Sequence, residues 1–204
     1  LGGSTVLMAE DGEQAIKLLD THVPGLVILD LLMPHVDGFD VLDVLRTRPS
    51  TQRVPVIILS GKVLTPDDVA RLSHPRVTFQ AKELLSDGEL AEALRRVWVG
   101  EEVLPQPTSL VVKRAIAHLQ QRHAEELTRQ DIALAVGVSE DYLSRIFRQE
   151  IGLTPWEFLS RYRVYRAKML LRASDAPILQ IAGQVGFSDL SYFNRVFRKL
   201  VGCA

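Results

Sequence analysis

The sequence predicts an α/β domain with a parallel sheet, followed by an all-α domain. Short apolar runs at residues 5–9, 26–29, 54–59 and 77–79 are each followed by polar residues, and amphipathic helical patterns separate them. This alternation is typical of a parallel sheet with helices on both faces. From residue 110 onward only helical periodicity remains, which predicts the second, all-α domain.

The length and the charge distribution support two domains with different partners. A chain of 204 residues with 47% apolar content is long enough for two cores. Residues 1–100 contain 10 Lys and Arg against 14 Asp and Glu, a net charge of −4. Residues 101–204 contain 14 against 11, a net charge of +3. The basic excess favours an anionic polymer as the partner of the second half.

Several classes of protein are disfavoured by the composition. No apolar stretch is long enough to span a membrane, and no secretory signal pattern opens the sequence. The single cysteine, Cys203, fits a reducing cytoplasm and predicts no disulfide, zinc or thiol chemistry. The five histidines are scattered, so a metal cluster is not expected. We therefore expect a cytoplasmic protein with no membrane partner.

The boundary between the domains is marked by a change of pattern. Helical spacing predicts short helices around residues 15–19, 39–45 and 67–72, and one around 90–97 that closes the first domain. Residues 99–109 lack periodicity and contain two prolines close together, as linkers do. The predicted first domain, linker and second domain are therefore residues 1–98, 99–109 and 110–204.

Three predicted strands lead to side chains that could share one chemical task. Asp30 and Ser60 directly follow apolar runs, and Lys82 lies just beyond the last one. Since parallel strands end at one edge of a sheet, a carboxylate, a hydroxyl and an ammonium meet there. This set suits phosphoryl transfer to Asp30 as nucleophile, with Ser60 bonding a phosphoryl oxygen and Lys82 pairing with the anion. Taken singly, these residues read as helix caps and a surface charge.

The string DLLMPHVDG, from Asp30 to Gly38, resembles the phospho-acceptor segment of two-component receiver domains. The resemblance implies a flavodoxin-like sheet in the order 2-1-3-4-5, with Asp30 as the phosphorylated residue. It implies that Phe79 is the switch aromatic, which swings inward as Ser60 moves toward the phosphoryl group. It also implies Mg²⁺, held by Asp30 and the backbone carbonyl of Leu32, and a sensor histidine kinase or phosphotransfer domain as phosphoryl donor.

The sequence departs from the receiver pattern at several positions. Glu83 stands where the family usually has a Pro with a cis bond, so that cis turn is not expected. No strand with an acidic pair precedes Thr5, and Glu10 and Asp11 follow a different strand. We therefore expect a fragment that lacks the first strand and does not itself work as a phosphorylation switch. Leu32 cannot orient a hydrolytic water, which predicts a long-lived phosphorylated form of the full-length protein.

The second half contains one helix-turn-helix layout twice, at residues 128–149 and 175–199, joined by a helix that begins at Pro155. Each copy has a Gly in its turn and a Ser predicted to cap the next helix: Gly137 and Ser139, then Gly186 and Ser188. The joining helix is predicted to bury the line Ser160, Val164, Ala167 and Leu171. A doubled layout is far more specific than a single one.

The doubled layout, with IAGQVGFSDLSYFNRVFRKLVG in its second copy, resembles the AraC/XylS-type DNA-binding domain over roughly residues 108–204, without that family's last segment. Recognition helices present the residues near their N-termini to base edges in the major groove. Arg145 and Arg195 are expected to contact guanine, and Arg148, Arg198 and Lys199 to contact phosphates. The candidate DNA-binding residues are Asp141, Ser144, Arg145, Arg148, Leu190, Ser191, Asn194, Arg195, Arg198 and Lys199.

These patterns together predict a response regulator: a non-enzymatic, sequence-specific transcriptional regulator controlled by phosphorelay to Asp30. The alternative is a pseudo-receiver that regulates the DNA-binding domain without phosphate, which the missing acidic pair favours and the intact Asp30, Ser60 and Lys82 disfavour. An ATPase is rejected because the sequence has no G-x-x-x-x-G-K-S/T phosphate loop. The expected partners are double-stranded DNA and a phosphoryl donor. A homodimer is compatible with this architecture, and the oligomeric state is left open.

Overall fold

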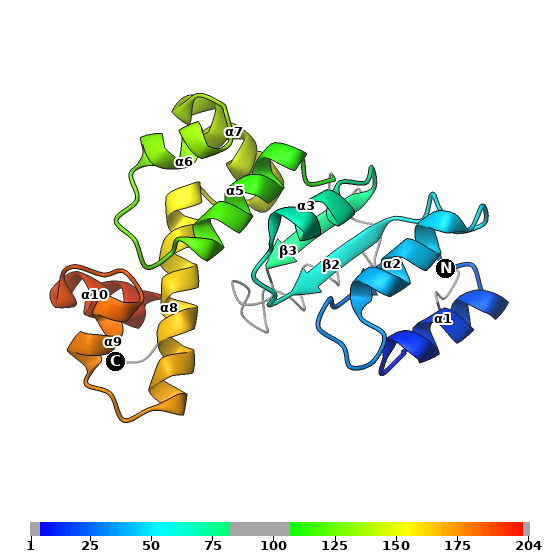
Figure 1. The fold of residues 1–204 in the computed structure, drawn as a ribbon, viewed down its shortest axis with the longest axis horizontal. Helices are drawn as coiled ribbons and strands as arrows, with labels where there is room; N and C mark the ends of the chain where they lie inside the picture. The colour runs from blue at the N-terminus through cyan, green and yellow to red at the C-terminus, as the bar shows by residue number, and fades with distance from the viewer. Residues whose placement is uncertain (1–4, 82–106, 202–204) are drawn as a thin grey trace.

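The first half of the protein forms a parallel three-stranded sheet with helices, as predicted (Figure 1). The computed structural model describes residues 5–81 and 107–201. In these ranges the sheet has the order β1-β2-β3. The elements of this half are α1 (Gly12–Thr21), β1 (Val27–Leu29), α2 (Gly38–Thr47), β2 (Val56–Ser60), α3 (Pro66–Leu72) and β3 (Val77–Ala81).

The register of the sheet brings the strand ends to one edge. Ile58 of β2 is level with Leu29 of β1 and with Phe79 of β3. All three side chains are buried, because strands covered by helices carry apolar residues on both faces. Asp30 follows β1 at this edge and Ser60 is the last residue of β2, so the predicted meeting of the two strand ends is observed.

The prediction of a strand at residues 5–9 is wrong. The segment belongs to no helix or strand, and Val6 and Met8 are 61% and 83% exposed. Within the described ranges β1 pairs only with β2, and Ile28 of β1 is also exposed. A strand needs a neighbouring strand to pair its backbone groups. Apolar pattern alone therefore did not make this segment a strand.

The second half is helical, as predicted, and contains two helix-turn-helix units joined by one long helix (Figure 1). The helices are α5 (Leu110–Gln121), α6 (Arg129–Ala135), α7 (Glu140–Ile151), α8 (Pro155–Ala173), α9 (Ile178–Gln184) and α10 (Leu190–Val201). Helix α8 packs against α5 and α7 in the first unit and against α9 and α10 in the second. None of the helices in the described ranges is both long and apolar enough to cross a membrane.

The buried face predicted for α8 is only half right. Val164 and Ala167 are buried, whereas Leu171 is 38% exposed. The N-terminal half of α8 instead buries Phe158 and Tyr162 in the core that it shares with α5 and α7. Because each half of the helix faces a different unit, the buried residues do not form a single straight line.

Arg163 of α8 joins the two units at their junction. This side chain is almost fully buried, its Nε donates to the His123 carbonyl at 2.7 Å, and its Nη2 donates to the Glu125 carbonyl at 2.8 Å. Its guanidinium carbon also lies 5.6 Å from the centre of the Phe187 ring in the second unit. A charge can be buried when its donors are satisfied in this way.

The α/β half packs against α5, the first helix of the helical half. Lys113 Nζ donates to the Leu72 carbonyl at 2.6 Å, and Gln120 Oε1 accepts from the Leu64 amide at 3.0 Å. Gln121 Nε2 donates to the Leu64 carbonyl at 2.6 Å. The buried apolar residues of α3 and α5 belong to one continuous core. The closing helix predicted around residues 90–97 and most of the predicted linker lie outside the described residues, so the domain boundaries stay predictions.

Candidate phosphorylation site and DNA interface

Asp30 lies half-buried at the edge of the sheet, directly after β1. Its Oδ1 accepts a hydrogen bond from the Leu32 amide at 3.0 Å. The residue lines a cavity of about 430 Å³ together with Glu10 and Asp11. The carboxylate therefore borders open space large enough for a phosphoryl group.

Asp37 and Gly38 lie at the start of α2, shortly after the acceptor site. They begin the helix rather than forming an isolated turn, because Asp37 and Asp40 make a capping box. A Cβ on Gly38 would lie 2.1 Å from the Asp30 carbonyl oxygen. Only glycine allows the helix to approach the strand end this closely, so Gly38 shapes the backbone around Asp30.

Ser60 ends the neighbouring strand and is fully buried. Its Oγ accepts from the Lys62 amide at 3.2 Å, and its Cα is level with that of Ala81 in β3. Phe79, the candidate switch residue, is fully buried, and its amide donates to Thr108 Oγ1 at 2.9 Å. Lys82, the candidate cation, lies outside the described residues.

The described residues do not assemble a magnesium site. No group of three Asp, Glu, His or Cys side chains in the described ranges could hold a metal ion. Asp11 lines the same cavity as Asp30, but its Oδ1 already caps α1 by accepting from the Gln14 amide at 2.8 Å. Mg²⁺ needs several oxygen ligands in octahedral geometry, and Asp30 with the Leu32 carbonyl falls short of that set.

The candidate DNA-binding residues lie on the surface of α7 and α10. Ser144 and Leu190 are half-buried, and the others are exposed: Asp141, Arg145, Arg148, Ser191, Asn194, Arg195, Arg198 and Lys199. The opposite faces of the two helices bury Leu143 and Phe147, and Phe193, respectively. Each helix thus buries its apolar side and leaves its polar side open to a partner.

The two units differ by one residue in the turn before the second helix. Ser139 caps α7 as predicted, since its side chain accepts from the Tyr142 amide. The prediction that Ser188 caps α10 is wrong, because α10 begins at Leu190 and the Asp189 side chain accepts from the Tyr192 amide. The second turn is one residue longer, which moves the cap to the next polar residue.

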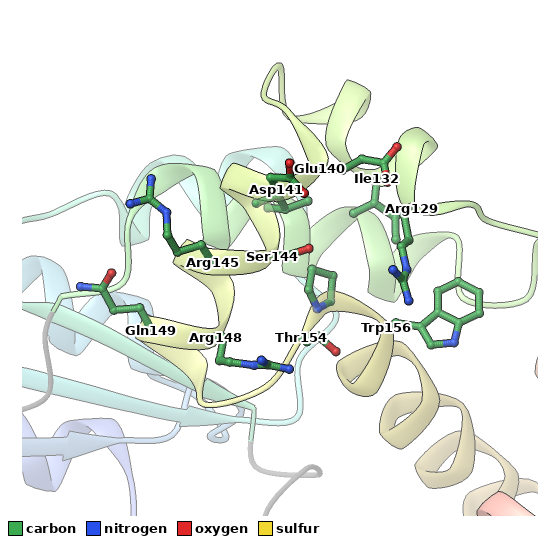
Figure 2. Close-up of a pocket in the computed structure, with 12 residues that line it drawn as sticks. Arg129, Ile132, Glu140, Asp141, Ser144, Arg145, Arg148, Gln149, Thr154 and Trp156 are labelled. Atoms are coloured by element: carbon green, nitrogen blue, oxygen red, sulfur yellow. The ribbon is translucent and has the colours of Figure 1, made fainter.

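A pocket of about 760 Å³ lies beside α7 and the start of α8 (Figure 2). Figure 2 shows the Arg129 and Arg148 side chains extending toward Thr154 and Trp156, whereas Arg145 extends away on the other side of α7. Arg129 is the first residue of α6 and was not among the predicted site residues. Its position directly after the Thr128 cap was the signal in the sequence that could have identified it.

Two residues of the domain junction were also missed from the sequence. Lys113 and Gln120 are both 1% exposed, although polar residues on a helix are usually solvated. They are seven residues apart and therefore lie on one face of α5. The seven-residue spacing of Lys113 and Gln120 was the only sign in the sequence that a second face of α5 is buried.

Two family profiles match the two halves of the chain. The profile described as "Response regulator receiver domain" matches residues 2–95, and the profile described as "Helix-turn-helix domain" matches residues 132–204. The chain therefore combines a response regulator receiver domain with an AraC-type helix-turn-helix domain. Among characterised families, this combination is typical of transcriptional regulators that are not enzymes.

The chain is similar to two curated transcriptional regulators and to one solved domain of a response regulator. The "Uncharacterized HTH-type transcriptional regulator YisR" of Bacillus subtilis (strain 168) is 33% identical in an alignment 152 positions long that covers 70% of this chain and 51% of YisR. The "Transcriptional regulatory protein HptR" of Staphylococcus aureus (strain bovine RF122 / ET3-1) is 28% identical in an alignment 220 positions long, gaps included, that covers 98% of this chain and 85% of HptR. The C-terminal domain of AraT, a response regulator from Geobacillus stearothermophilus, is 34% identical, covers 48% of this chain and 81% of that domain, and has a TM-score of 0.46. The regulator spans about half the length of YisR.

Proposed function

We propose that the regulator binds double-stranded DNA through α7 and α10 and accepts its phosphoryl group at Asp30. The observation that carries the DNA assignment is that Arg145 and Arg195 are exposed at matching positions of two equivalent helices. Counted from the caps at Ser139 and Asp189, each Arg is the sixth residue. An Arg presents two parallel donors to the O6 and N7 acceptors of guanine in the major groove.

The pocket beside α7 supports an adjacent contact with the DNA backbone. Arg129 and Arg148 line it together with Thr154 at the start of α8 (Figure 2). Contacts with phosphates position a protein on the duplex without reading bases. We assign Arg129 and Arg148 to this task, and Arg198 and Lys199 to the equivalent task in the second unit.

Alanine substitution at Arg145 and Arg195 tests the DNA assignment. On a site selected from random DNA by the unmodified regulator, Arg145→Ala and Arg195→Ala are each expected to cost about 1–3 kcal/mol and to relax base preference at one position. Footprinting is expected to show two contacted segments about 34 Å apart on one face of the duplex.

A suitable control is Arg172→Ala, which removes the same charge from the exposed C-terminal end of α8. It should leave base preference unchanged. A single contacted segment, or equal losses on selected and random DNA for the Arg145 and Arg195 variants, would contradict the proposal.

The junction with α5 offers a route from the acceptor site to the DNA-binding half. The loop after Ser60 includes Leu64, and both the amide and the carbonyl of this buried residue are bonded to glutamines of α5. A movement of Ser60 toward a phosphoryl group would therefore pull on Gln120 and Gln121. This connection supports control of the helical half by the receiver half.

The acceptor assignment predicts a dependence on further acidic residues. We expect the 204-residue chain to be labelled less fully at Asp30 by acetyl phosphate and Mg²⁺ than a chain with an added acidic pair, because Mg²⁺ binds through several oxygen ligands. A chain extended upstream by a strand with an acidic pair is expected to be labelled, and its Asp30→Asn variant is not. Mass measurement under acidic conditions gives the readout.

Stoichiometric, Mg²⁺-dependent labelling of the 204-residue chain would contradict the expected ligand requirement. If the extended chain were not labelled either, the pseudo-receiver alternative would replace phosphorylation at Asp30. The DNA assignment would stand in both cases, since it is measured separately.

A further inference from the structure

The two recognition helices share a second repeated feature, a tyrosine ring beneath each candidate base-reading arginine. The guanidinium carbon of Arg145 lies 5.5 Å from the centre of the Tyr142 ring. The guanidinium carbon of Arg195 lies 5.2 Å from the centre of the Tyr192 ring. Each Tyr precedes its Arg by three residues, so both lie on one face of the helix.

The Tyr–Arg pair is present in both units although their turns differ in length. Tyr142 is the third residue of α7 and Tyr192 is the third residue of α10. Had the pairs arisen from the loops, the extra residue before α10 would have displaced the second one. The pairing is therefore set by the helices themselves, in both units.

The rings are held at the border between core and solvent. Tyr142 and Tyr192 are 39% and 37% exposed, so each keeps part of its ring available to a neighbour. In the second unit the Tyr192 ring also packs against Phe187, at 5.8 Å between ring centres, and Phe187 is buried. The ring is thus supported from the core side while its outer part contacts Arg195.

The arginines have no competing partner among the described residues. All ion pairs found in those ranges involve other arginines or Lys62, so no carboxylate holds the guanidinium of Arg145 or Arg195. A cation over an aromatic face is attracted to it, and a stacked guanidinium keeps its N–H donors along its rim. Stacking also restricts the arginine side chain in the protein without DNA, so less conformational entropy is lost when the arginine binds a base.

We propose that Tyr142 and Tyr192 are positioning residues that hold Arg145 and Arg195 in the orientation that reads a base. The inference rests on the proposed DNA-binding function of these arginines. It assigns to each ring an effect on base discrimination, transmitted through the neighbouring guanidinium rather than through a DNA contact of the tyrosine hydroxyl.

The test is a double-mutant cycle on the complete chain, with selected and random DNA. Tyr142→Leu is expected to weaken binding to the selected site roughly 2- to 5-fold, the effect of one exposed cation–π contact, without weakening binding to random DNA. Tyr142→Phe keeps the ring and should keep both affinity and base preference. In the Arg145→Ala background, Tyr142→Leu should cause no further loss.

The same cycle with Tyr192 and Arg195 tests the inference independently in the second unit. All variants are compared at a temperature below their measured unfolding midpoints, so that every protein is folded. Equal losses for the Phe and Leu variants, or losses that add fully to that of the Arg variant, would overturn the inference and leave the DNA-binding function intact. A regulator that failed to distinguish selected from random DNA would overturn both.

Discussion

Gly186→Ala is expected to destabilise the second helix-turn-helix unit more strongly than the same change in the first. Gly186 has a φ of 94°, a conformation that costs an L-residue about 1–2 kcal/mol. A Cβ at this position would also lie 2.5 Å from the His123 carbonyl oxygen and 2.9 Å from two guanidinium nitrogens of Arg163. Forcing an extra carbon into packed surroundings adds about 1–3 kcal/mol.

The neighbours of Gly186 cannot move aside without further loss. The His123 carbonyl accepts from Arg163 Nε, and the same guanidinium bonds the Glu125 carbonyl. Shifting this side chain would leave a buried charge with fewer partners. The added methyl group therefore disturbs the junction that joins the two units through α8.

Gly137→Ala is the matched control, because Gly137 occupies the equivalent turn with a φ of 74° and a Cβ added there would meet no heavy atom within 4 Å. It should cost only the conformational penalty of about 1–2 kcal/mol. Denaturant unfolding of both variants measures the difference. Equal losses would show that the contacts at Gly186 do not matter.

Lys113→Met is expected to stabilise the regulator at neutral pH by as much as about 3 kcal/mol, the equivalent of its pKa shift. Lys113 is 1% exposed as a residue, and burial lowers its pKa to about 8, against an opposing effect of Glu150. Methionine has a similar shape and avoids the cost of burying a charge. The Leu72 carbonyl keeps a partner in the variant, because it also accepts from the His74 amide at 2.8 Å.

The pH dependence gives this prediction its sign. In the unfolded chain Lys113 holds its proton up to its ordinary pKa of 10.5, whereas in the folded protein it releases the proton above about 8. Between these values the unfolded state binds more protons, so the free energy of unfolding of the unmodified regulator rises with pH. The advantage of the Met variant should therefore be largest below pH 8 and disappear toward pH 10.5.

Comparing unfolding free energies of the two proteins at each pH isolates this residue, because the other titrating groups are common to both. Lys199→Met, at an exposed lysine of α10, serves as the control for the general effect of replacing a lysine by methionine. A pH-independent difference for Lys113→Met would contradict the burial of its charge.

For the three strands and the helices of the described ranges, the sequence by itself determined their order and the edge where Asp30 and Ser60 meet. Apolar runs followed by polar residues specify strands that end together, because parallel strands share a direction. The doubled helical layout specified the two units, and Gly137 and Gly186 specified their left-handed turns. These features are local, so the residues that carry them are close together in the sequence.

The features that only the tertiary structure decided depend on residues far apart in the chain. Residues 5–9 have the pattern of a strand but pair with none of the strands in the described ranges, and they are exposed. Lys113 is of a residue type usually found on the surface, yet it is buried because α3 covers the face of α5 on which it lies. Arg163 is buried because two units meet at α8. Backbone pairing and burial both require a second segment that is distant in the sequence. Periodicity along the chain shows which face of a segment is apolar, but not which other segment will cover it.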